Sequence, residues 1–262
     1  MSDTPNIAPC KSREDQTDTL IPEKYDWREA FPDCVQEAVS EGNCSASYAV
    51  ASVSMVQDRI CQQVKKPVRL SAQEVIDCDK GNYGCEGGYV TRALSWGKRK
   101  GFIPEECYPY IAEKAECDAD EHLSTNECRA NNQIYRLIDY CLASDDQGIK
   151  REILKNGPVI AQMTIYTDFL TYSNGIYHRT EDAFKFNGNH IVKIVGWERQ
   201  GDGAEFWIVE NNWGADWGEN GYVRISASDK STQLDFYAIG VAVYPYTMAE
   251  YYNMQEQQER TS

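Results

Sequence analysis

Two different hydrophobic periods follow one another along this chain. Between residues 47 and 64, apolar side chains recur at spacings of three and four, which predicts a helix that is buried along one face. Ser71 and Glu74 have the spacing of a capping box for a short second helix. Further helices are predicted from about residue 90 to a glycine stop at 101, and from about residue 149 to 156.

After residue 158 the pattern becomes strand-like. Strands are predicted at 159–165, 190–197, 205–211, 222–226 and 237–243. The segment between about 104 and 145 is rich in Cys, Asp and Asn, and we expect it to be mostly loop. Helices first and strands second are typical of an α+β chain with two lobes, and we expect the functional site in the cleft between these lobes.

The overall composition narrows the classes of function. A length of 262 residues with 42% hydrophobic content suits one large domain or two lobes around a sizeable core. The net charge of −15 disfavours binding to nucleic acid and to anionic membranes, and no run is long and apolar enough to span a bilayer. No CxxC pair is present, so we expect no structural zinc site. We also expect no other metal and no cofactor.

The most distinctive motif lies where the first long helix is predicted to begin. The segment 39–49 reads Val-Ser-Glu-Gly-Asn-Cys-Ser-Ala-Ser-Tyr-Ala. It resembles the Gln-Gly-x-Cys-Gly-Ser-Cys-Trp-Ala signature of papain-family cysteine proteases. On that signature, Glu41 falls on the glutamine of the oxyanion hole, Cys44 on a structural half-cystine, Ser47 on the nucleophile and Tyr48 on the aromatic residue that follows it.

Further motifs extend the resemblance over roughly residues 24 to 245, in the order of the family. They are 25–28, 71–78, 84–88, 108–110, the histidine segment at 189–190, and the asparagine segment at 206–214 with 217–222. Tyr48, Cys107 and the segment 168–170 look most like the cathepsin C and cathepsin X branch. The resemblance implies a papain-like α+β fold with a helical lobe and a β-barrel-like lobe.

The two positions that carry the family's chemistry differ in this chain. A papain-type site needs a thiolate at a helix N-terminus, but Ser47 supplies a hydroxyl, which is far less acidic. Ser47 would attack only if His190 acted as a general base, with Asn211 orienting the imidazole as the resemblance implies. Glu41 has no donor for a developing oxyanion, and its charge would repel one.

Three more residues are expected at the site through the same resemblance. Gly87 and Gly88 match the family segment whose backbone pairs with a bound peptide, and the alternative is a tight turn without that role. Trp213 is expected to shield the histidine and asparagine pair and to line the substrate-binding region.

The ten cysteines give two opposed expectations. The family pattern implies a Cys44–Cys85 bridge and a Cys78–Cys117 bridge, and the cathepsin C-like spacing adds Cys107 with Cys128. Four cysteines are left over: Cys10, Cys34, Cys61 and Cys141. Because residues 1–5 are polar and acidic and do not form a signal peptide, we expect cytosolic synthesis with mostly reduced thiols. A lysosomal or secreted location is the alternative if the chain is a mature fragment.

The two ends lie outside the resemblance. We divide the chain into a polar arm at 1–23, a papain-like domain at 24–245 and a tail at 246–262, and we expect neither end to have a core to join. Tyr246, Tyr251, Tyr252 and Met254 would either form a docking strip or belong to a frayed terminus.

The sequence therefore favours a papain-like pseudoprotease with a binding or structural role. We expect protein partners to bind through the terminal segments or the cleft, possible settings being a cytoskeletal or ciliary assembly. Two alternatives stay open. One is an active or weakly active cathepsin-like peptidase, seen as a Cys-to-Ser form, and the other is a secreted decoy that binds peptides.

Overall fold

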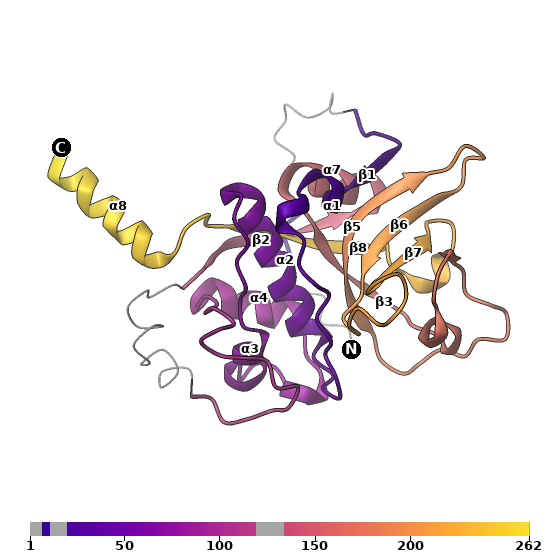
Figure 1. The fold of residues 1–262 in the computed structure, drawn as a ribbon, viewed down its shortest axis with the longest axis horizontal. Coiled ribbons are helices and arrows are strands. Elements are labelled where there is room, and N and C mark those ends of the chain that lie inside the picture. Colours follow the sequence, from indigo (N-terminus) through magenta and orange to yellow (C-terminus); the bar gives the residue numbers. More distant parts are fainter. Residues whose placement is uncertain (1–6, 11–19, 119–133, 262) are drawn as a thin grey trace. The chain divides into compact units, whose positions relative to one another are not determined.

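The strands of the computed structural model lie in one eight-stranded sheet, and the structure describes residues 7–10, 20–118 and 134–261. The strand order is β2-β8-β3-β5-β6-β7-β4, with β1 paired to β5. Figure 1 shows β5, β6 and β7 side by side. This path has two ends. The sheet is not closed, so the barrel-like lobe expected from the family resemblance is wrong, whereas the mixed α+β class is confirmed.

The backbone divides into two units, which we describe separately. Unit 1 comprises 1–41 and 140–241, and unit 2 comprises 42–139 and 242–262. The elements of unit 1 are β1 (Lys24–Asp26), α1 (Trp27–Ala30), η2 (Pro32–Cys34), α7 (Asp145–Asn156), β3 (Val159–Met163), η4 (Thr167–Thr171), β4 (Ile176–Tyr177), β5 (His190–Arg199), β6 (Glu205–Glu210), β7 (Tyr222–Ser226) and η5 (Lys230–Thr232). Strands β2 (Leu137–Ser144) and β8 (Tyr237–Val243) cross the division.

The long strand β5 organises unit 1. Its first half, from His190 to Ile194, pairs with β3, and its second half, from Gly196 to Glu198, pairs with β1. Strand β6 occupies the other edge. A side chain at Gly196 would put its Cβ only 2.1 Å from the carbonyl oxygen of Tyr25, so β1 can approach only because this residue is glycine.

An apolar cluster lies in unit 1. Trp197 and Trp207 are fully buried within it, and α7 packs on β3 and β5 through Ile149 and Ile153. The period-2 pattern of the strands and the three- and four-residue spacing of α7 therefore bury their apolar faces in one core, as expected.

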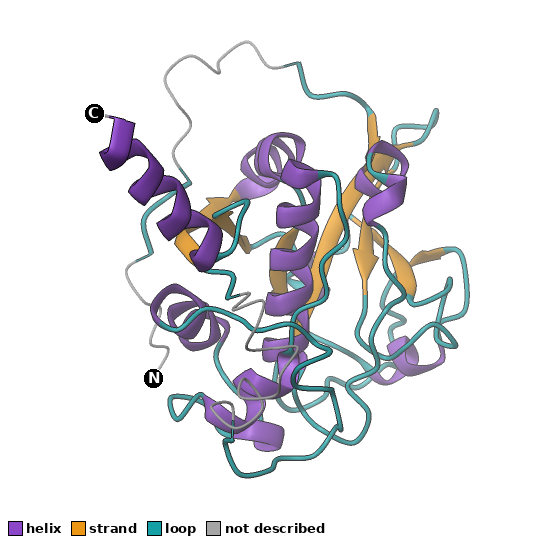
Figure 2. Ribbon diagram, turned by 60° about the vertical axis from the view of Figure 1, so that its left-hand side comes forward, coloured by secondary structure: helices purple, strands orange, loops and turns teal. Residues whose placement is uncertain are grey.

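Unit 2 is helical. It contains α2 (Ser47–Val64), η3 (Gly84–Glu86), α3 (Ala72–Cys78), α4 (Val90–Arg99) and α8 (Met248–Thr261). Helix α2 packs against α3 and α4 (Figure 2). Its residues Val53, Val56 and Ile60 are buried. The predicted helix at 47–64 is confirmed residue for residue.

Both segments that we expected to have no core to join make contacts. At the N-terminal end, Pro9 forms a parallel bridge with Leu142, and the Cys10 amide donates to the carbonyl of Leu142 at 2.9 Å. These contacts belong to β2, a strand that the sequence pattern missed. The expectation of an unattached arm is therefore wrong for residues 7–10.

The C-terminal segment forms α8, which begins at a capping box. The Thr247 amide donates to Glu250 at 2.7 Å, and the Glu250 amide donates to the Thr247 hydroxyl at 3.2 Å. The Met248 amide also donates to the carbonyl of Ile134 at 2.9 Å. The tail is thus a capped helix attached to unit 2, which neither of the two expectations for it described.

Candidate active site

His190 and Asn211 meet at one end of two paired strands. His190 is the first residue of β5, and Asn211 directly follows the last residue of β6. Because β5 and β6 are antiparallel, the start of one lies beside the end of the other. The Nε2 atom of His190 lies 2.8 Å from Oδ1 of Asn211, and both residues are buried.

The second bond of Asn211 fixes the protonation pattern of the imidazole. The Asn212 amide donates to Oδ1 of Asn211 at 2.9 Å, which identifies this atom as the acceptor. His190 must therefore carry its proton on Nε2, and Nδ1 is the basic nitrogen. Burial lowers the pKa of His190 to about 4, against the smaller opposing effect of the Asn211 hydrogen bond. The imidazole is neutral at pH 7.

Trp213 covers this pair. Its ring centroid lies 5.1 Å from that of His190, and it packs on Trp217 and Phe169 at 5.2 and 5.6 Å. Trp213 therefore contributes to the burial of the imidazole, and burial is the main cause of the lowered pKa of His190. Trp213 thus lies in contact with the histidine, and its role in lining a substrate-binding region stays a prediction.

Glu41 joins the same group of residues in unit 1. Its backbone is held by the Asn212 carbonyl, which accepts from the Glu41 amide at 2.9 Å, and by a bridge between Ser40 and Trp213. The carboxylate is buried and accepts a hydrogen bond from Nε1 of Trp213 at 3.0 Å. Its Oε1 lies 3.9 Å from Nδ1 of His190, too far for a hydrogen bond, and a neutral imidazole makes no ion pair.

Ser47, the expected nucleophile, is the first residue of α2 in unit 2. The preceding residue, Ala46, makes no side-chain hydrogen bond to the helix terminus. Cys44 is bonded to Cys85, and the Ser45 amide donates to the carbonyl of Cys85 at 3.0 Å. These links fix the segment that leads into the helix.

Gly87 and Gly88 lie beside the same helix in unit 2. Gly87 has a φ of +102°, and a Cβ at Gly88 would lie 2.8 Å from the ring of Tyr48. The hydroxyl of Tyr48 in turn donates to the carbonyl of Gly84 at 3.2 Å. Backbone conformation and packing therefore explain both glycines as a tight turn, and peptide binding by this segment stays a prediction.

Comparison with known proteins decides the family. The description "Papain family cysteine protease" matches residues 21–242. The chain belongs to the papain family of cysteine proteases. Within this family it is 32% identical over 230 residues to Cathepsin B-like CP3 of Giardia intestinalis, covering 85% of this chain and 75% of that protein.

Two other relatives show the range of papain-family proteins that resemble the chain. Tubulointerstitial nephritis antigen of Bos taurus is 34% identical over 236 residues, which cover 79% of this chain and half of that protein. Procathepsin B S9 of Trypanosoma congolense superposes with a TM-score of 0.84 at 27% identity, covering 93% of this chain and 85% of that one. These names support a cathepsin B-like kinship, and the cathepsin C and X branch stays an expectation.

The disulfides contradict the predicted reduced state. The two bridges of the papain-family pattern are present, Cys44–Cys85 at 2.05 Å and Cys78–Cys117 at 2.08 Å. A third bridge joins Cys10 and Cys141, which the sequence left unassigned. Cys34, Cys61 and Cys107 are also disulfide-bonded, whereas Cys128, the expected partner of Cys107, lies outside the described residues. These bridges and the cathepsin relatives indicate a lysosomal or secreted protein rather than a cytoplasmic one.

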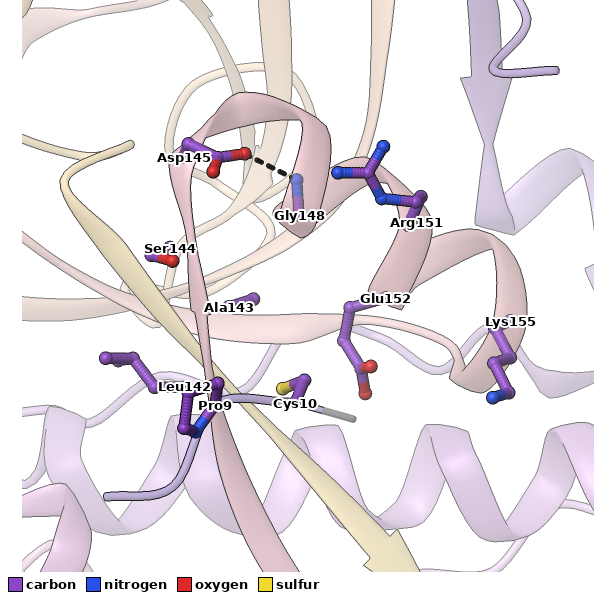
Figure 3. Close-up of a pocket in the computed structure, with 10 residues that line it drawn as sticks. All are labelled: Pro9, Cys10, Leu142, Ala143, Ser144, Asp145, Gly148, Arg151, Glu152 and Lys155. Carbon is purple, nitrogen blue, oxygen red and sulfur yellow. Dashed lines mark hydrogen bonds between the residues drawn. The ribbon is translucent and has the colours of Figure 1, made fainter. Parts of the chain in front are cut away.

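Unit 1 also contains a cavity of about 170 Å³ that sequence reasoning missed (Figure 3). It is lined by none of the residues assigned through the papain family; its lining residues are Pro9, Cys10, Leu142, Ala143, Ser144, Asp145, Gly148, Arg151, Glu152 and Lys155. The sulfurs of Cys10 and Cys141 lie within 4.8 Å of a Glu152 oxygen, but their mutual bond leaves them no thiolate with which to ligate a metal.

Among the helices of the described residues, none has the length and apolar character that a membrane-spanning helix needs.

Proposed function

We propose that this papain-family chain is a pseudoprotease that acts by binding or as a structural component. The observation that carries the proposal is the buried carboxylate of Glu41. It occupies the oxyanion-glutamine position of the family signature, and it already accepts a hydrogen bond from Trp213. A carboxylate cannot donate to an oxyanion, and loss of one such donor alone costs about 2.7–4 kcal/mol of transition-state stabilisation.

The base and the nucleophile support the same proposal. A histidine with a pKa of about 4 is a weak acceptor for the proton of a serine hydroxyl at pH 7. It also cannot supply the imidazolium that would stabilise a thiolate.

The papain-like part, taken as 24–245, would then serve as a stable binding domain between the arm at 1–23 and the tail at 246–262. The relatives named as nephritis antigens, rather than as proteases, are consistent with such a role. The disulfides favour partners in the lysosome or outside the cell, in place of the cytoskeletal or ciliary setting expected from the sequence.

A peptidase is the second candidate, and the His190–Asn211 hydrogen bond favours it because this part of the family's catalytic group is intact. A peptide-binding decoy is the third, for which the Gly87-Gly88 turn would hold the peptide backbone.

The decisive experiment uses the purified, disulfide-bonded chain with a mixed peptide library and a serine-reactive fluorophosphonate probe. The pseudoprotease should cleave no peptide and should not be labelled at Ser47. Cleavage that disappears in Ser47→Ala and remains in Ser54→Ala would overturn the proposal and establish a serine-dependent peptidase. Binding of uncleaved peptides that is lost on Gly88→Ala would favour the decoy.

A further inference from the structure

The loop before α2 contains a modification motif that the papain-like chemistry does not use. Asn43-Cys44-Ser45 has the form Asn-x-Ser with a middle residue other than proline, and it is the only Asn-x-Ser/Thr triplet in the chain. We infer that Asn43 is an acceptor for an N-linked oligosaccharide.

The structure places both functional residues of the triplet at the surface. Asn43 and Ser45 are exposed, whereas Cys44 between them is buried and bonded to Cys85. Asn43 lies in a turn that follows Gly42, whose φ of +62° starts the change of direction before α2. An oligosaccharide on Asn43 would therefore extend into solvent without displacing a buried group.

The disulfides supply the second line of support, which is independent of the triplet. Bridges such as Cys44–Cys85 and Cys78–Cys117 form in the oxidising compartments of the secretory route, where oligosaccharides are transferred to asparagine. In the transfer, Nδ2 of Asn43 attacks the anomeric carbon of a lipid-pyrophosphate-linked oligosaccharide. The nitrogen–carbon bond forms, the bond from carbon to the pyrophosphate oxygen breaks, the lipid pyrophosphate leaves, and the amide loses one proton.

The folded geometry also sets the order of events. The Cys44–Cys85 bridge and the hydrogen bond from the Ser45 amide to the Cys85 carbonyl hold the triplet in a fixed turn. A transferase that needs an extended acceptor must act before this bridge closes. Slower closure of the bridge should therefore raise the fraction of chains that carry the oligosaccharide.

The position of the acceptor gives the modification a consequence. Asn43 lies two residues after Glu41 and four before Ser47, so the oligosaccharide would be attached to the loop that follows Glu41 and leads into α2. It would hinder the approach of a large protein substrate to this loop. The inference concerns a covalent group and holds whether or not Ser47 has any activity.

The test expresses the full chain behind a secretion signal in eukaryotic cells and measures its intact mass before and after treatment with a peptide N-glycosidase. We expect a mass decrease for the wild type and conversion of Asn43 to Asp in the peptide map. Asn43→Gln and Ser45→Ala should remove the decrease. Ser45→Thr should keep it, as should Asn174→Gln, a control at an exposed asparagine outside any such triplet.

The peptide map of the wild type tests the inference even if the variants fail to fold, because it does not depend on them. A peptide with Asn43 found only unmodified, in the secreted chain or in the chain retained inside the cell, overturns the inference. Addition of dithiothreitol during synthesis should raise the modified fraction. Mass readouts involve no peptidase assay, so failure here is distinct from failure of the pseudoprotease proposal.

Discussion

The indole of Trp213 donates a hydrogen bond to the carboxylate of Glu41 at 3.0 Å, beside the imidazole of His190. The residue that the family resemblance assigns to the oxyanion position is thus held in place by the same aromatic side chain that packs against the histidine. The two effects can be separated by substitution.

The first prediction concerns recovery of activity. Ser47→Cys alone should give a weakly reactive thiol, because the Glu41 charge still opposes an oxyanion. Adding Glu41→Gln should raise kcat/KM on a peptide substrate by a further ~10²–10³. The matched control adds Glu37→Gln, a change at an exposed glutamate in the preceding loop, and should have no effect. Equal rates in the single and double variants would show that Glu41 is not at the oxyanion position.

The second prediction concerns the energy of the Glu41–Trp213 contact. Trp213→Phe keeps an aromatic ring beside His190 but removes the donor, so a buried carboxylate loses a partner. We expect Trp213→Phe to lower the free energy of unfolding by about 1–3 kcal/mol more in the chain that has Glu41 than in the chain that carries Glu41→Leu. Urea unfolding of the wild type, the two single variants and the double variant measures this difference. If the effects of the two substitutions simply add, the hydrogen bond contributes nothing to stability.

The third prediction concerns acid stability through His190. Its pKa is about 4 when folded and near 6.5 when unfolded, so the unfolded chain binds more protons in this interval. The contribution of neutral His190 to the free energy of unfolding is fully present above pH 6.5. It is lost as the pH falls to about 4, and the total loss is about 3 kcal/mol. His190→Gln should remove this dependence in urea midpoints measured across the interval, whereas His178→Gln, at an exposed histidine, should retain it.

The fourth prediction has the opposite sign and concerns Glu74. Burial raises its pKa to about 7, against the effect of the Ile103 amide, which donates to Oε2 at 3.2 Å. The folded chain binds the extra proton, so stability is greatest below about pH 4.5 and falls by about 3 kcal/mol as the pH rises to 7.

The effects of Glu74 and His190 on the pH dependence of the free energy of unfolding therefore offset one another between about pH 4.5 and 6.5. Glu74→Gln keeps an acceptor for the Ile103 amide, and in this variant the free energy of unfolding should fall with decreasing pH because of His190 alone. In His190→Gln, the free energy of unfolding should fall with increasing pH because of Glu74 alone. A pH profile identical to that of the wild type in Glu74→Gln would show that the buried carboxyl titrates normally.

The fifth prediction concerns the bridge between Cys10 and Cys141, which are 131 residues apart. Replacing both cysteines by alanine removes a constraint on the unfolded chain and should lower the free energy of unfolding by about 2–5 kcal/mol. Calorimetry compares this variant with the wild type. An unchanged unfolding temperature would mean that the described contacts of residues 7–10 suffice without the bridge.

The sequence predicts the elements that a local pattern specifies. The helix at 47–64 and strands β5 and β6 follow from apolar periodicity, and family motifs brought His190 and Asn211 together. Half of the predicted capping box at 71–74 forms: Ser71 accepts from the Glu74 amide, but the Glu74 side chain turns to Ile103. The box at 247–250 went unnoticed because the segment lies outside the resemblance.

Features that depend on distant partners were not predictable. Strand β2 has only Leu137 and Ala143 buried, so it shows no clear alternation and depends on pairing. The open sheet cannot be told from a closed one by strand patterns alone. The Glu41–Trp213 contact and the Cys10–Cys141 bridge join residues more than 100 positions apart, and no local spacing signals either.

The shared edge of β5 also constrains how this protein is made. Strand β1 is synthesised about 170 residues before its partners Gly196 to Glu198. Because synthesis proceeds at about 5–20 residues per second, β1 remains without its partner β5 for several seconds or longer. The helices α2, α3 and α4 need no such late partner and can assemble while the ribosome is still at work, so unit 1 should complete its sheet last.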